Sequence, residues 1–184
     1  MKKFITLIAT LTVIIAALTG CVFANETPAA EEPEDTAIVE APPQQMPEPQ
    51  TFVLIKLSDQ KLWVLKNTNV TDSPDGCQIL FESGIVSGTA GTDRATPTGT
   101  FKVENKVNGT YLRPSDGGKV WVDYWIPFVE NSIGMHDATW RGEEEFGTDQ
   151  YKVSGSHGCI NLPHGAAETL WGLVDVGTPV RVVD

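Results

Sequence analysis

The sequence predicts a mainly β domain, of the sandwich or barrel type, with one main helix near its C-terminus. Three observations predict this fold class. From residue 51 onward, short runs of β-branched, aromatic and aliphatic residues recur at fairly regular spacing. Gly, Pro and Asp separate these runs, as is typical of turns. One segment has its apolar residues at helical spacing, and no repeat with a period of about 20 to 50 residues is visible.

The predicted strands follow one another along the chain. The first two, TFVLIKL and KLWVLKN, are separated by residues 58–60 and predict a hairpin. In the later run WVDYWIPF, Trp121 and Trp125 would share one strand face, and we expect both to pack in the core. The remaining strands are expected within 78–88, 96–107, 119–129, 132–136 and 178–184.

The predicted helix lies in the segment LPHGAAETLWGLV. Pro163 stands near its start and Gly177 follows its end, as is typical of helix boundaries. Between them, apolar residues recur at helical spacing, at positions 167, 170, 171 and 174.

The N-terminus has the layout of a secretory signal. Lys2 and Lys3 precede an apolar run of 16 residues, which is short for an uncleaved membrane span. We therefore expect residues 1–20 to be a signal peptide.

The end of this segment, Leu-Thr-Gly-Cys, is similar to the bacterial lipobox. We expect Cys21 to be lipidated and to hold the exported protein at the outer face of the cytoplasmic membrane. The alternative is cleavage after Ala24, which would give a secreted or wall-associated protein.

Residues 21–50 are predicted to be a disordered linker, and residues 51–184 the folded domain. From 22 to 50 the chain has six prolines, seven acidic residues and no Lys or Arg, so it cannot bury enough apolar surface to fold. The domain carries 17 acidic and 11 basic residues with no basic stripe, which argues against a nucleic-acid partner. We expect a monomer.

The other two cysteines leave a Cys77–Cys159 disulfide open as an alternative in an exported protein. Cys77 starts an apolar run, and we expect it to be a buried small residue.

The segment SGSHGCINLP, residues 154–163, is the candidate catalytic motif. The Cys159 thiol has an ordinary pKa of about 8.5, so it needs a neighbouring base to become a nucleophile. His136, at the end of a predicted strand, is the best candidate for that base. Gly155 and Gly158 free the backbone around the cysteine, so that its N–H groups could converge on an oxyanion.

A zinc site is the competing interpretation of the same residues. His157 and Cys159 are two apart and would point the same way on a strand, and His136 and His164 could complete the shell. Spacing alone favours the nucleophile but leaves the zinc site and a purely structural cysteine open.

Two motifs together resemble the catalytic region of the L,D-transpeptidases, the YkuD-like family: IGMHDATW, and SGSHGCINLPHGAAETLWGLVDVGTPVRV. ATPTGTFKV is similar to a strand motif upstream in that family, and the similarity spans residues 52–183. In one respect the chain departs from the pattern. Nineteen residues separate His136 from Ser156, so we expect a longer loop at 141–153.

The resemblance implies a role for each motif residue. Cys159 would be the nucleophile and His136 the general acid and base. Asp137 or Ser156 would orient the imidazole, and Asn161 would brace the turn or contact substrate. The oxyanion hole would be built from backbone N–H groups, those of His157, Gly158 and Cys159.

It also implies the reaction. Cys159 would form a thioester with a tetrapeptide stem of peptidoglycan, releasing D-Ala, and would pass the acyl group to the side-chain amine of a diamino acid, giving a 3–3 cross-link. With water as acceptor the enzyme would be an L,D-carboxypeptidase. Neither a metal nor an organic cofactor is required.

Stem peptides carry carboxylates, so we expect Arg141 or Lys152 to bind the donor. Tyr111, Arg113 and Trp140 are further candidates for lining the site. A sortase and a non-catalytic, zinc-stabilised wall-binding module are the rival classes; the sortase motif does not match SHGC.

Overall fold

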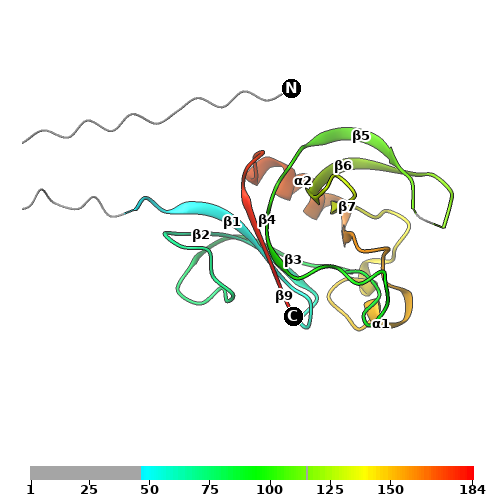
Figure 1. Ribbon diagram of the computed structural model, residues 1–184, viewed down its shortest axis with the longest axis horizontal. Helices are drawn as coiled ribbons and strands as arrows, with labels where there is room; N and C mark the ends of the chain where they lie inside the picture. The colour runs from blue at the N-terminus through cyan, green and yellow to red at the C-terminus, as the bar shows by residue number, and fades with distance from the viewer. Residues whose placement is uncertain (1–46, 115) are drawn as a thin grey trace, which may run out of the picture. The chain divides into compact units, whose positions relative to one another are not determined.

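The computed structural model describes residues 47–114 and 116–184, which form two β-sheets, two short α-helices and one 3-10 turn (Figure 1). The expectations for the signal peptide and for Cys21 concern residues outside this part of the chain. Within it, no helix has both the length and the apolar character needed to span a bilayer.

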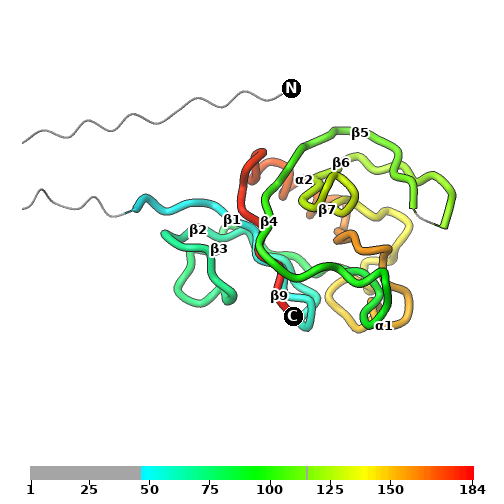
Figure 2. Tube along the Cα trace, viewed as in Figure 1, coloured from blue at the N-terminus to red at the C-terminus, as the bar shows by residue number. Residues whose placement is uncertain are grey.

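The first sheet has five strands in the order β3-β2-β1-β9-β4. β9 (Pro179–Val183), the last strand of the chain, runs between β1 and β4, parallel to β1 and antiparallel to β4 (Figure 2). Its neighbours are β1 (Gln50–Lys56), β2 (Lys61–Asn67), β3 (Gln78–Gly84) and β4 (Gly99–Lys102).

The hairpin β1–β2 confirms the first predicted element, and its unbroken apolar sequence has a structural reason. Both faces of these strands are covered. Val53 and Val64 point into the main core, whereas Phe52, Leu54 and other side chains of the opposite face form a second, smaller cluster. A strand buried on both faces carries consecutive apolar residues instead of alternating ones.

The second sheet has four strands in the order β5-β6-β7-β8. β7 and β8 are parallel, and the other neighbours are antiparallel. The strands are β5 (Val107–Leu112), β6 (Val120–Val129), β7 (Ile133–Asp137) and β8 (Ile160–Leu162).

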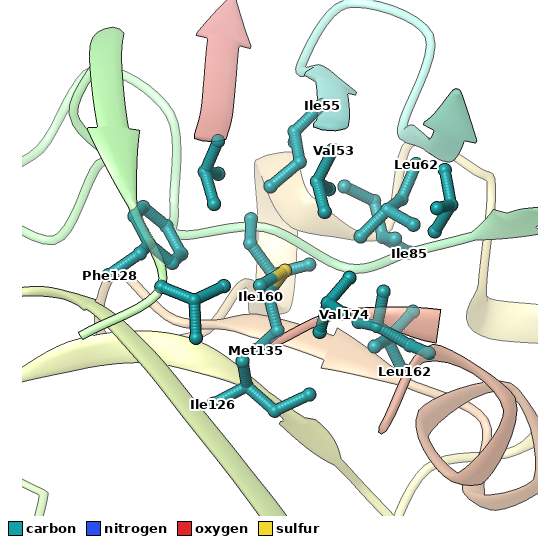
Figure 3. Close-up of a cluster of buried hydrophobic side chains, with 14 of the residues drawn as sticks. Val53, Ile55, Leu62, Ile85, Ile126, Phe128, Met135, Ile160, Leu162 and Val174 are labelled. Carbon is teal, nitrogen blue, oxygen red and sulfur yellow. The ribbon is translucent and has the colours of Figure 1, made fainter. Parts of the chain in front are cut away.

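The main core lies between the two sheets (Figure 3). Val53 and Ile55 of the first sheet face Ile126 and Met135 of the second, and all four side chains are essentially without solvent exposure. This packing confirms the mainly β prediction and resolves it as a sandwich of two sheets instead of a closed barrel.

The helix α2 (His164–Leu173) follows β8 and confirms the predicted helix. Ala167 and Leu170 bury its apolar side against the main core. Its C-terminal carbonyls are covered by Lys106, whose Nζ donates to the carbonyls of Trp171 at 2.7 Å and Val174 at 2.6 Å.

Three expectations require correction. β5 and β8 are separate strands, which the sequence patterns did not predict. Trp121 is 49% exposed, because it lies on the outer part of the β5–β6 hairpin against Tyr111, whereas Trp125 is buried as expected. Cys77 is only partly buried and lies beside the Asn67 amide; Cys77 and Cys159 are both free thiols.

Candidate active site

The sheet brings the two motifs together at β7 and β8. His136 on β7 is paired with Asn161 on β8, and Cys159 immediately precedes β8. The backbone of Asn161 is held from its other side by Val86, which exchanges two hydrogen bonds with it, at 2.9 and 3.0 Å. The motif therefore sits between two segments distant from it in sequence.

A buried glutamine fixes the segment that holds the motif. Gln60, in the β1–β2 turn, accepts a hydrogen bond from the Ser87 N–H at 2.9 Å and donates to its hydroxyl at 2.8 Å. Ser87 in turn accepts from the Ser156 N–H through its carbonyl at 2.9 Å. The turn of the first hairpin thus supports the catalytic motif through the backbone of residues 85–88.

His136 and Cys159 open on one cavity of about 780 Å³. Asn161 is part of its wall, and so are four other candidate substrate-binding residues: Tyr111, Arg113, Trp140 and Arg141. Lys152 is not part of the wall. It lies on α1 (Tyr151–Ser154), where its ammonium pairs with Asp149 at 2.8 Å.

The Cys159 thiol is partly buried, and burial raises its pKa above the ordinary value. A backbone hydrogen bond from Gly134 acts in the opposite direction. The sulfur also lies 4.0 Å from the Ser132 carbonyl oxygen. The thiol is therefore stabilised in its neutral form in the free protein.

The His136 imidazole is 4% exposed, and burial lowers its pKa. Its Nδ1–H donates to the Asp137 backbone carbonyl at 2.8 Å, and its Nε2 accepts from the Asn161 amide at 3.1 Å. The carbonyl bond and the Asp137 charge raise the pKa, whereas the Arg141 charge lowers it further. The Asp137 carboxylate itself points elsewhere and accepts from the N–H groups of Asp123 and Tyr124.

Ser156 contacts the backbone of its own turn instead of His136. Its hydroxyl donates to the Cys159 carbonyl and accepts from the Gly158 N–H at 3.1 Å. Of the three N–H groups expected in an oxyanion hole, that of Gly158 is thus already used within the turn. The backbone N–H groups of His157 and Cys159 remain as candidates for the oxyanion hole.

Thr96 is a site-supporting residue that the sequence analysis missed. Its hydroxyl donates to the Gly158 carbonyl at 2.8 Å and accepts from the Gly88 N–H at 2.9 Å. Thr96 opens the TPTGTF motif, so the signal was present, but 62 residues separate it from its partner.

The histidines of the alternative zinc shell do not converge. The Nε2 atoms of His157 and His164 lie 2.7 and 3.0 Å from the carboxylates of Asp116 and Asp123. In the described part of the chain, the ligand atoms that do gather are those of Asp123, Asp137 and His164, within 4.8 Å of one another. Cys159 is not among them.

Comparison with known proteins identifies the family. The family model of the L,D-transpeptidase catalytic domain matches residues 50–182. The chain belongs to this family. The probable L,D-transpeptidase 3 of Mycobacterium tuberculosis is 29% identical over 111 residues, which is 55% of this chain and 39% of that protein. The chain thus spans about two fifths of that relative.

Two solved L,D-transpeptidase structures from Enterococcus faecium have the same fold. A crystal structure of a variant is 34% identical and covers 73% of this chain and 50% of its own, with a TM-score of 0.60. An NMR structure of the catalytic domain acylated by ertapenem is also 34% identical, covers 73% of this chain and 97% of its own, and has a TM-score of 0.57.

The loop at 141–153, expected to be long for an L,D-transpeptidase, contains a 3-10 turn, Glu143–Glu145, and leads into α1. Arg141 opens this loop, and two of the five N–H donors of its guanidinium are used within the protein. Its Nε donates to Asn161 Oδ1 at 2.9 Å and its Nη1 to Glu145 at 2.9 Å, and the side chain is only 8% exposed. Arg141 is therefore a part of the site's framework.

Proposed function

We propose that this protein is a peptidoglycan L,D-transpeptidase with Cys159 as nucleophile and His136 as general acid and base. The observation that carries the proposal is the opening of Cys159 and a buried, hydrogen-bonded His136 on one cavity of about 780 Å³. A cavity of this size fits a stem peptide.

The first half-reaction is acylation of the thiol. As a donor tetrapeptide excludes water, His136 accepts the Cys159 proton, and the thiolate attacks the carbonyl between the diamino acid and the terminal D-Ala. The N–H groups of His157 and Cys159 would stabilise the oxyanion. His136 then returns the proton to the leaving amine, so that D-Ala departs as a thioester forms.

The second half-reaction transfers the acyl group. The side-chain amine of a second stem attacks the thioester, His136 takes its proton, and the thiolate leaves as the 3–3 amide bond forms. The chain's own residues supply each proton transfer.

Arg113 is the donor-binding residue that we propose in place of Arg141 and Lys152. It lines the cavity, and a guanidinium is suited to the carboxylates of a stem peptide. Tyr111 and Trp140, both about half exposed at the cavity, would offer apolar surface beside it.

The substrate lies outside the cytoplasm, which agrees with the secretory signal expected at residues 1–20. We propose that Cys21 carries a lipid anchor and that residues 21–50 connect it to the catalytic domain at 51–184. We also propose that the protein acts as a monomer.

The test is mass spectrometry of the intact protein after incubation with ertapenem, which acylates the related catalytic domain from Enterococcus faecium. We expect one covalent adduct, located on Cys159 by peptide mapping, and none on a Cys159→Ala variant. A folded protein that gains no adduct would contradict the proposal.

A second measurement identifies the acceptor. A disaccharide tetrapeptide is supplied alone and then with an excess of a free amine acceptor, and the products are separated by liquid chromatography and mass spectrometry. From a transpeptidase we expect a cross-linked dimer when the tetrapeptide is alone, and the tripeptide joined to the added amine by a new amide bond when that amine is in excess. Tripeptide and free D-Ala as the sole products would instead identify an L,D-carboxypeptidase.

A further inference from the structure

Arg141, Asn161 and His136 form a chain of hydrogen bonds in which each link restricts the next. Arg141 Nε donates to Asn161 Oδ1 at 2.9 Å, Asn161 Nδ2 donates to His136 Nε2 at 3.1 Å, and His136 Nδ1 donates to the Asp137 carbonyl at 2.8 Å. We propose that Arg141 is a positioning residue that fixes the Asn161 amide and, through it, the tautomer of His136.

The direction of each of these hydrogen bonds follows from the donors and acceptors that the residues offer. A guanidinium can only donate, so the Asn161 oxygen must face Arg141. The amide NH₂ then faces His136, and Nε2 must present its lone pair. At the other side of the ring the Asp137 carbonyl can only accept, so it favours the same tautomer, with the proton on Nδ1.

Burial makes these restrictions effective. His136 and Asn161 are 4% and 2% exposed, and the Arg141 side chain is 8% exposed, so water does not replace a lost partner easily. In such surroundings a mismatched donor or acceptor is costly, and a fully satisfied network selects one arrangement.

Both ends of this series of hydrogen bonds are held in place as well. The Asn161 backbone is fixed by its two hydrogen bonds to Val86. The Arg141 guanidinium is fixed by Glu145, whose other carboxylate oxygen accepts from the Gly142 N–H at 3.0 Å. Glu145 thus ties the start of the 141–153 loop to the same network, and the loop and the imidazole are coupled through Arg141.

The consequence for catalysis rests on the proposed function of His136. A neutral imidazole with its lone pair at Nε2 can accept a proton there without first changing tautomer, and that proton takes the place of the Asn161 hydrogen bond. If the Asn161 amide were free to turn over, its oxygen would face Nε2 and favour a proton there, and the ring would lose its basic nitrogen on that side. Arg141 prevents that rotation.

The experiment determines the tautomer directly. Long-range proton–nitrogen correlation spectra of the ¹⁵N-labelled full chain distinguish the two ring nitrogens at neutral pH, and His136 is assigned with His157→Gln and His164→Gln variants. The wild-type ring is expected to be protonated at Nδ1. An Arg141→Met variant is expected to show a mixture of tautomers and acylation by ertapenem that is slower by about tenfold or more, part of the 10²–10⁴-fold contribution of a general acid–base group.

Lys152→Met is the matched control, because it removes a positive charge from the same loop. The partner of that charge is the exposed Asp149. The Lys152→Met variant should keep the wild-type tautomer and acylation rate. A folded Arg141→Met protein that also keeps the wild-type tautomer and acylation rate would overturn the proposal. A wild-type His136 ring protonated at Nε2 would overturn it too, even if the Arg141→Met variant does not fold. Failure of the wild-type protein to form any adduct would refute the proposed function but leave the tautomer measurement valid.

Discussion

At the scale of single residues, Cys159 and His136 are buried in a way that moves their pKa values in opposite directions. Burial disfavours the charged form of each group, so it raises the pKa of the thiol and lowers that of the imidazole. The directions of both pKa shifts favour a neutral thiol and a neutral imidazole over a thiolate–imidazolium pair.

This resting state predicts the pH dependence of thiol alkylation. Because the pKa of Cys159 is raised, its thiolate becomes abundant only above about pH 8.5, the ordinary pKa of a thiol. The rate at which iodoacetamide labels Cys159 should therefore rise about tenfold per pH unit from pH 6 to about pH 8.5, and should continue to rise at higher pH. Labelling is measured by mass spectrometry of the peptide that contains Cys159. A rate that is constant from pH 6 upward would indicate a preformed ion pair instead.

A second prediction concerns Gly88, where backbone segments meet behind the motif. A Cβ at this position would lie 2.0 Å from the Arg94 carbonyl oxygen and 2.9 Å from the Gly158 Cα. Gly88→Ala should lower the free energy of unfolding by about 1–3 kcal/mol and displace the catalytic turn, slowing ertapenem acylation by up to about 10²-fold. Urea denaturation and adduct formation measure the two effects.

The matched control is Gly165→Ala in α2, where a Cβ would meet nothing within 4 Å. This variant should keep the wild-type stability or exceed it by up to about 0.5–1 kcal/mol, because alanine is the better helix former, and should react normally. If Gly88→Ala behaves like this control, the close packing behind the turn does not support the site.

At the scale of elements, Lys106 connects the start of β5 to the end of α2. Its ammonium covers two carbonyls of the helix C-terminus, where a positive charge also complements the helix dipole. Lys106→Met should lower the free energy of unfolding by about 1–3 kcal/mol, because both carbonyls lose a charged donor. Lys66→Met, an exposed lysine on β2, is the control and should change stability by less than about 0.5 kcal/mol.

The elements that the sequence predicted are those whose local pattern agrees with their tertiary surroundings. The β1–β2 hairpin and α2 have apolar residues at the right spacing and turn residues at their ends. β5 contains Asn108 and Gly109, which are poor strand formers, and it is a strand because β6 pairs with it. β8 is only three residues long and is defined by β7 and Val86.

In the candidate site, too, local sequence patterns predict some features, whereas others depend on how the sheets assemble. The proximity of His136 and Cys159 could be predicted, because each lies beside a recognisable motif. The places of Arg141 and Thr96 could not, since their partners lie 20 and 62 residues away and depend on how the sheet is assembled. Arg141 was expected to bind substrate because it is a charged loop residue near a motif; its hydrogen bonds to Asn161 and Glu145 had no signal in the sequence.

At the scale of the whole molecule, the two cores and the cavity wall are built from residues between Phe52 and Val183. We therefore predict that a chain of residues 47–184 folds and reacts independently. Its urea unfolding midpoint and its rate of acylation by ertapenem should match those of the longer chain in detergent. A truncated chain that unfolds earlier or reacts more than about threefold slower would show that the preceding residues contribute to the domain.

The last prediction concerns where the protein acts. If Cys21 is lipidated, two or more acyl chains would hold the protein stably on a membrane, whereas cleavage after Ala24 would release it. The wild-type protein should therefore sediment with membranes, and Cys21→Ala should move it to the soluble extracytoplasmic fraction while ertapenem still labels Cys159. Globomycin, which blocks processing of lipidated precursors, should make the wild-type precursor accumulate and leave the Cys21→Ala protein unaffected. Normal processing in the presence of globomycin, with wild-type protein in the soluble fraction, would favour the cut after Ala24, because only the lipid-dependent route passes through Cys21.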